Sequence, residues 1–213
     1  MSADGTRKAE TTAETAVEIT GAWERPGDYR PPLSITRPEI LRDGSDSAFR
    51  ELIWGLLVVA KRLQKYPEIF GRRIGVSSAQ YTVLIATAHI QGGEGIGIRA
   101  LADYMHLPAP HITTTVGRLV EAGLLAKRQN PADGRGVLVS MTKEGDAALR
   151  KLAPFQQQVN DVLFAGLSRR EFEIFGQMID TFLVNSEEAL IKAAALERAG
   201  VRSTRPPPNV AVE

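Results

Sequence analysis

The side chains best suited to chemistry in this sequence are small polar groups near the start of one predicted helix, at about residues 109–121. His111, Thr113, Thr114 and Thr115 lie together, and Arg118 follows one turn later. Hydroxyl and imidazole groups can hydrogen-bond base edges or phosphates, and a threonine methyl can contact a thymine methyl. The alternative is that the threonines are surface residues whose hydroxyls bond only the backbone.

A second charged group follows between two predicted strands, at about residues 124–128 and 137–141. Asp133-Gly134 is a strong turn signal, and Arg135 comes directly after it. An exposed arginine at such a tip suits a narrow minor groove, where the negative potential is high. Because Asp133 would repel phosphate, we expect it to hold Arg128 or Arg135 by a charge-assisted hydrogen bond. The alternative is a solvated salt bridge that contributes almost nothing to stability.

The elements that must position these residues form a recognisable order. A short helix is predicted from Ile98 to Met105, then a tight connection, the helix carrying the threonines, and the two strands. Pro110 suits a first helical turn because its missing N–H costs little there. This order is a helix-turn-helix followed by a β-hairpin. On the second helix of such a unit, the polar side chains favour DNA as the partner.

Helices are predicted on both sides of this unit. Apolar residues recur every three or four positions from about Ser45 to Tyr66. Capping signals predict three further helices, which begin near Ser77, Thr142 and Ser168. Pro154 lies inside the second of these, where we expect a kink or a break.

Composition and motifs exclude several classes of function. The chain has 213 residues, a formal net charge of +1 and no cysteine, which removes disulfides, thiolate metal sites and thiol switches. No apolar run is long enough to span a bilayer, and the N-terminus has no secretory signal, so a cytoplasmic location is expected. The sequence contains no phosphate loop, nucleophile elbow or paired-carboxylate pattern, and its three histidines lack metal-ligand spacing. We expect neither an enzyme nor a cofactor or metal site.

We expect three segments along the chain. Residues 1–44 are predicted to be an extended or flexible arm. Residues 45–198 are predicted to be one domain, whose DNA-binding part covers about 78–145, and residues 199–213 a flexible tail. An alternative for the arm is that Trp23, Tyr29 and Leu33 pin it to the body or to a partner subunit.

Four stretches together resemble one known family. They are LADYMHL, HITTTVGRLVEAGLL, NPADGRG and VLVSMTKEG, and the Asp133-x-Arg135 pair before a Val-Leu-Val-Ser-x-Thr strand and Gly145 is the most specific part. They resemble the winged helix-turn-helix of the MarR family of bacterial transcriptional regulators, and the resemblance extends over about residues 45–196. It implies a mostly α fold with a small β-hairpin wing, plus N- and C-terminal dimerisation helices that form a homodimer.

The resemblance also assigns roles to particular residues. It places Pro110, His111, Thr113 and Thr114 where the family reads its operator, Arg135 in the minor groove, and Asp133 as the residue that orients the wing. Thr114 stands where arginine is common in the family, which leaves the base preference open. The expected DNA-contacting set is Pro110, His111, Thr113, Thr114, Thr115, Arg118, Arg128, Asp133 and Arg135.

Family members typically release DNA when a small ligand, often a phenolic or aromatic acid, enters a cleft beside the dimerisation helices. The candidate residues near that cleft are Trp54, Arg72, Arg73, Tyr81 and His89. Each also has an ordinary structural explanation: a core tryptophan, a hydrogen-bonded histidine, or arginines that are solvated or contact phosphate.

The sequence therefore predicts a dimeric, sequence-specific DNA-binding regulator. We expect a repressor that a small ligand releases from a pseudo-palindromic, double-stranded operator, with no membrane association. Two alternatives stay open. One is a winged-helix module for protein interaction or dimerisation without specific DNA binding. The other is an activator, or a regulator without a ligand.

Overall fold

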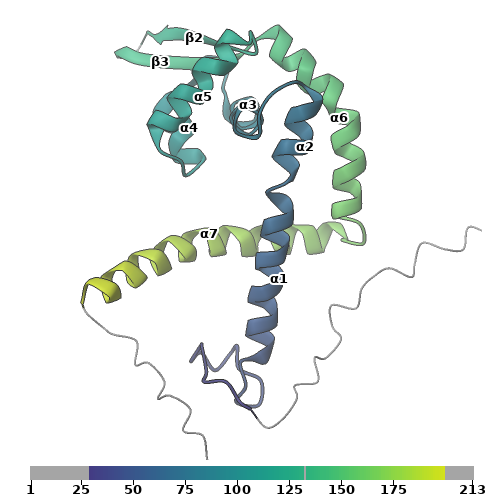
Figure 1. The fold of residues 1–213 in the computed structure, drawn as a ribbon, viewed down its shortest axis with the longest axis vertical. Coiled ribbons are helices and arrows are strands. Elements are labelled where there is room, and N and C mark those ends of the chain that lie inside the picture. The colour runs from purple at the N-terminus through teal and green to yellow at the C-terminus, as the bar shows by residue number, and fades with distance from the viewer. Residues whose placement is uncertain (1–28, 132, 200–213) are drawn as a thin grey trace, which may run out of the picture. The chain divides into compact units, whose positions relative to one another are not determined.

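The computed structural model describes residues 29–131 and 133–199 and, at 133–135, the backbone alone. The described part is mostly helical with one small sheet (Figure 1). Its elements in chain order are α1 (Ser47–Leu63), α2 (Tyr66–Arg73), α3 (Ser78–Ile90), β1 (Ile96–Gly97), α4 (Ile98–Tyr104), α5 (Ala109–Glu121), β2 (Leu125–Asn130), β3 (Asp133–Met141), α6 (Lys143–Leu163) and α7 (Arg169–Arg198).

The sheet is antiparallel, with the strand order β1-β3-β2. The predicted hairpin is therefore present, and the two-residue strand β1 extends it by pairing Ile96 with Val139. The turn differs from the prediction: β3 already begins at Asp133, which pairs with Asn130 after a register shift. Pro131 explains why the turn comes here. It has no N–H to continue the ladder, so β2 ends at Asn130, the residue before it.

The chain divides into two compact units, Met1–Leu63 and Gln64–Glu213. In the first unit, the segment before α1 is fastened to the start of that helix. The backbone N–H and the hydroxyl of Ser34 both donate to one carboxylate oxygen of Asp46, at 2.8 and 2.6 Å. Arg50 pairs with the same carboxylate and also donates to the carbonyl of Pro32 at 2.6 Å. At least this part of the predicted arm is held in place, whereas Trp23 lies outside the described residues.

The core of the second unit is where α3, α4 and α5 meet the sheet. Leu84, Leu101, Ile112 and Leu119 are completely buried and pack with Val139 of β3. The start of α6 abuts this core at Gly145, where a Cβ atom would lie 2.2 Å from the carbonyl oxygen of Leu124. Only glycine fits this approach.

The sequence did not predict α2. It packs its Phe70 ring against Tyr81 of α3, with centroids 5.7 Å apart, and against Phe155 of α6 at 6.0 Å. Leu152 of α6 completes this second apolar cluster. The predicted helix at 45–66 is thus α1 followed by a separate short helix, which begins beside Pro67, a favoured residue in a first turn.

The predicted helix starts at Ser77, Thr142 and Ser168 are all confirmed by side-chain caps. The expected break at Pro154 is wrong, because α6 runs through it without interruption. Pro154 and Arg150, whose carbonyl loses its helical donor there, are both exposed, so water can satisfy that carbonyl. Every residue of α7 is exposed, and no described helix is long and apolar enough to cross a membrane.

Candidate nucleic-acid interface

Helices α4 and α5 form the predicted helix-turn-helix. The turn between them carries His106 in the left-handed region, at φ 50°, and its N–H donates to the carbonyl of Asp103. Pro108 then caps α5 in an extended conformation. Ile112, Val116 and Leu119 bury one face of α5 against α3 and the sheet, which fixes the face that remains in solvent.

The exposed face of α5 carries most of the predicted DNA contacts. Pro110, His111, Thr113, Thr114 and Arg118 are all exposed. The Thr113 hydroxyl donates to the Ala109 carbonyl at 2.9 Å, and that of Thr114 to the Pro110 carbonyl at 3.1 Å. These bonds occupy the hydroxyl protons, but the methyl groups and oxygen lone pairs remain available to a base edge.

Thr115, which was expected among the DNA-contacting residues, does not lie on the exposed face of α5. It is only 5% exposed, and its hydroxyl donates to the carbonyl of His111 at 2.9 Å. Successive helical residues are rotated by about 100°, so three in a row cannot share one face. Thr115 lies next to the buried Val116 and belongs to the core side.

At the wing, Arg128 has a partner that the sequence did not reveal. Its guanidinium donates to the carbonyl of Glu94 at 2.7 Å and forms an ion pair with the Glu94 carboxylate. Glu94 precedes β1, 34 residues earlier in the chain, so no local pattern points to this pair. The side chains of Asp133 and Arg135 lie outside the described residues, and their predicted roles stay predictions.

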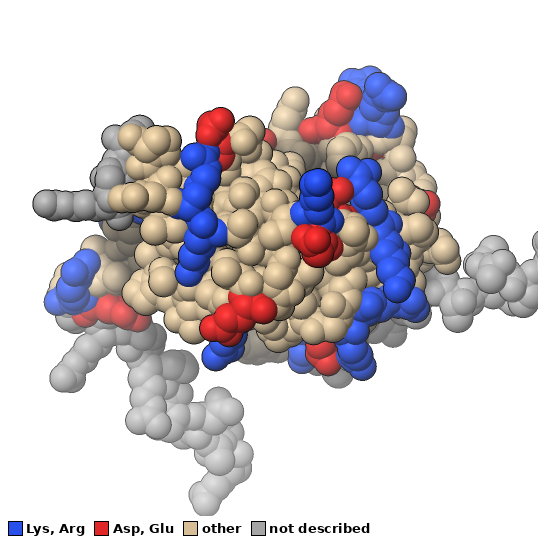
Figure 2. Space-filling view, turned by 90° about the horizontal axis from the view of Figure 1, so that it is seen from above, with Lys and Arg blue, Asp and Glu red and all other residues tan. Residues whose placement is uncertain are grey.

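Basic side chains do not merge into one large patch on the face seen in Figure 2, where several lie beside acidic ones. Two basic residues that no sequence pattern pointed to are Arg99 of α4 and Lys127 of β2. Both line a hollow of about 830 Å³ together with Thr113 of α5.

The five residues expected near a ligand have different local surroundings, and their role in binding a ligand stays a prediction. Trp54 is exposed on α1, in the first unit, and Arg72 pairs within α2 with Glu68 at 3.0 Å. Arg73 lies over the Phe155 ring, 3.6 Å from its centroid. Tyr81 is buried, accepts a hydrogen bond from the Gln156 amide at 2.8 Å, and has a pKa raised by that burial. It stays protonated at neutral pH.

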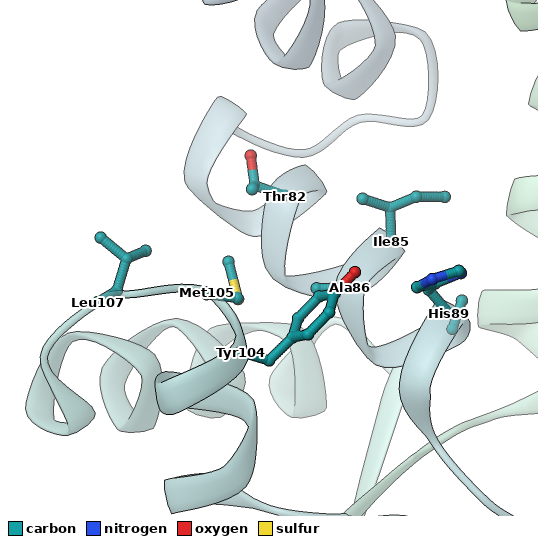
Figure 3. A pocket seen from close by; sticks show the side chains of 8 residues that line it. Thr82, Ile85, Ala86, His89, Tyr104, Met105 and Leu107 are labelled. Carbon is teal, nitrogen blue, oxygen red and sulfur yellow. The ribbon is translucent and has the colours of Figure 1, made fainter. Parts of the chain in front are cut away.

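His89, the fifth residue, lines a pocket of about 650 Å³ formed by α3 and the end of α4 (Figure 3). Its ring lies 6.1 Å from that of Tyr104, centroid to centroid. The main lining side chains are Thr82, Ile85, His89, Tyr104, Met105 and Leu107. The walls are therefore mostly apolar, with a few polar groups at separate points. Among the described residues, no group of acidic or histidine side chains could hold a metal ion.

Comparison with known proteins agrees with this geometry. The model of the MarR family matches residues 74–136. The transcriptional regulator HosA of Escherichia coli O111:H- is 28% identical over 104 residues, which is 49% of this chain and 75% of HosA.

Solved structures share the fold. CouR from Rhodococcus jostii RHA1, solved with bound p-coumaroyl-CoA, has a TM-score of 0.52 and 24% identity, covering 64% of this chain and 90% of CouR. A mutant of MarR from E. coli, solved with operator DNA, has a TM-score of 0.50 and 23% identity, covering 63% of this chain and 97% of the other. The segment that matches the model of the MarR family, residues 74–136, thus runs from just after α2 into the wing, and the solved structures share its winged helix-turn-helix fold.

Proposed function

We propose that this protein is a homodimeric, sequence-specific DNA-binding transcriptional repressor that a small aromatic ligand releases from its operator. The observation that carries the proposal is the N-terminal half of α5, where the exposed polar side chains of His111, Thr113 and Thr114 lie on the solvent face within the segment that matches the MarR family. A helix presented in this way can enter a major groove without bulk that would hold it off the base edges.

The dimer rests on the C-terminal helices. Phe172, Phe175, Ile179 and Phe182 form an apolar stripe along α7, and all are exposed. Such a stripe on a helix of 30 residues requires cover, and we propose that a second copy of the chain provides it. A twofold dimer places two α5 helices about one DNA turn apart, roughly 34 Å, on a pseudo-palindromic operator.

In this proposal the wing makes a second contact with DNA, in addition to that of α5. Arg135 is the minor-groove residue and Asp133 orients the wing around it. Arg135→Ala is expected to weaken operator binding by about 1–3 kcal/mol. Affinity equal to the wild type's at physiological salt would remove Arg135 from the interface.

For the effector, we propose the pocket between α3 and α4. Apolar walls suit an aromatic ring, and Thr82, His89 and Tyr104 supply polar groups that can orient a carboxylate or phenol. The p-coumaroyl-CoA bound to CouR makes aromatic acids and their thioesters the first compounds to test.

The decisive experiment is fluorescence anisotropy of the purified protein with the intergenic DNA upstream of its own gene, beside a scrambled duplex. Preferential binding that one aromatic carboxylate or thioester abolishes is the expected result. His89→Ala should then weaken the response to that compound and leave DNA affinity unchanged. Equal binding to both duplexes would instead favour the interaction-module alternative, which the exposed stripe of α7 also fits.

A further inference from the structure

The hollow lined by Arg99 and Lys127 lies between the two parts of the winged helix. Arg99 and Asp103 reach it from α4, Thr113 from α5, and Lys127 and Val137 from the sheet. Its lining thus includes both the helix proposed to enter the major groove and the strands of the wing.

The position of Lys127 follows from the strand that carries it. Side chains alternate along a strand, so Lys127 shares a sheet face with Leu125, two residues earlier. Leu125 is buried in the core, whereas Lys127 is exposed and lines the hollow. Its stem therefore continues the core face, while its ammonium group extends into solvent beside α5.

Arg99 and Lys127 differ from Arg128, their basic neighbour. The guanidinium of Arg128 forms an ion pair with the Glu94 carboxylate, as described above. Neither Arg99 nor Lys127 forms an ion pair with any residue whose side chain the structure describes, a set that leaves out residues 133–135. These two cations, 28 positions apart in the chain, face one hollow with their charges uncompensated by a bonded carboxylate.

The path of the DNA backbone between two grooves indicates which group these cations would bind. A protein with one element in a major groove and another in the adjoining minor groove must straddle the sugar-phosphate backbone that separates the two. We infer that this hollow is a seat for that backbone, and that Arg99 and Lys127 bind its phosphates. The inference rests on the proposed function and assigns to these residues the sequence-independent part of DNA binding, which depends on cations that neutralise phosphates.

Asp103 lines the same hollow and gives the inference a second, opposite test. A carboxylate beside a phosphate reduces affinity by repulsion. Removing the lysine should therefore weaken binding, and removing the carboxylate should strengthen it, at the same site.

The experiment measures the affinity of the full-length protein for a random-sequence duplex of about 30 base pairs between roughly 50 and 200 mM salt. Each neutralised phosphate contributes about −0.9 to the slope of log affinity against log salt. Lys127→Ala and Arg99→Ala should each lower the magnitude of this slope by about one. The ratio of wild-type affinity to variant affinity should therefore fall about threefold as the salt concentration rises over this range. Asp103→Asn should raise affinity at low salt. The control is Lys151→Ala, an exposed lysine on α6, which should leave both quantities unchanged.

The outcomes separate the two proposals. If the wild type does not bind the duplex even at about 50 mM salt, the proposed DNA-binding function itself fails. If the wild type binds but Lys127→Ala and Arg99→Ala behave like Lys151→Ala, only the phosphate seat is wrong. Inorganic phosphate titrated into the free protein at constant ionic strength should bind no more tightly to the wild type than to Lys127→Ala. Phosphate binding that Lys127→Ala abolishes while its affinity for the duplex stays at the wild-type level would assign the hollow to a small phosphorylated ligand and overturn the inference.

Discussion

The winged-helix core and helix α7 use apolar residues at similar helical spacing but bury them to opposite degrees. Leu101 and Ile112 of the core are completely buried, whereas Phe182 of α7 is 49% exposed. Both regions form helices for local reasons, α7 through the capping box of Ser168 and Glu171. The difference shows that one copy of the chain encloses its winged-helix core, whereas the longest of the described helices is left exposed. Since most of a helix's stability in a protein comes from packing of its apolar face, α7 gains stability from a second copy of the chain.

The largest expected effect comes from a charge placed in the α7 stripe. Phe182→Glu replaces a ring that the proposed dimer buries, and both subunits carry the change. The loss of apolar burial and the cost of burying two carboxylates should together weaken the dimer by about 4–6 kcal/mol, or roughly a thousandfold or more. Sedimentation velocity over a concentration series should show monomers where the wild type is dimeric.

Gln177→Glu is the matched control, because it adds the same charge to the same helix on the side opposite the stripe. It should leave the dimer intact. If both variants remained dimeric, the stripe would not be the interface. If both dissociated, the effect would come from charge on α7 rather than from the apolar face.

The next largest effect is expected within the core. Gly145→Ala forces a methyl group against the Leu124 carbonyl, which is backbone and cannot move cheaply. The free energy of unfolding should fall by about 3 kcal/mol, measured by urea denaturation. Gly117→Ala in α5 meets no atom within 4 Å and should raise stability by up to about 1 kcal/mol. Equal effects of the two substitutions would contradict the close approach of α6 to the core.

These two regions also show what the sequence could reveal. The starts of α3, α6 and α7 were predictable because a cap is a relation between residues three positions apart. Helix α2 escaped prediction because it is short, and Lys65 before it makes no side-chain cap. Within the described residues, the features missed at the site are non-local ones, such as the pairing of Ile96 with Val139 and the contact between Glu94 and Arg128.

Thr115 is a different kind of failure, because helical geometry alone excludes three adjacent outward residues. Pro110, His111, Thr113 and Thr114 are exposed because the buried positions of α5 fix its orientation, and their contact with DNA stays a prediction. A sequence therefore predicts faces of elements better than it predicts which faces meet.

A smaller and local effect is expected before α1, in a cluster that belongs to neither region. This cluster, the clasp, consists of the hydrogen bonds from Ser34 and Arg50 to the Asp46 carboxylate. Hydrogen bonds from Arg50 and from Ser34 hold the pKa of the Asp46 carboxyl well below its usual range. A lowered pKa in the folded state stabilises the clasp above the ordinary aspartate value of about 4, and this stability is lost as the pH falls towards the lowered pKa. The amide resonance of Ser34 should thus titrate with a midpoint well below pH 4. In Asp46→Asn this titration should disappear, and a midpoint near the ordinary value would contradict the clasp.

The smallest effect is expected in the turn between α4 and α5, where two opposing contributions nearly cancel. His106 adopts φ 50°, which costs a residue with a Cβ atom about 1–2 kcal/mol relative to glycine. Glycine, however, gives the unfolded chain more freedom, which lowers stability by about 0.4–1 kcal/mol. The strain term is the larger, so His106→Gly should raise the free energy of unfolding by about 0.5 kcal/mol. Urea denaturation of this variant beside Ala100→Gly, a substitution within α4 that should destabilise by up to about 1 kcal/mol, tests the sign. If both variants lost stability equally, the strain at His106 would contribute nothing, and the turn would be held entirely by the core on either side of it.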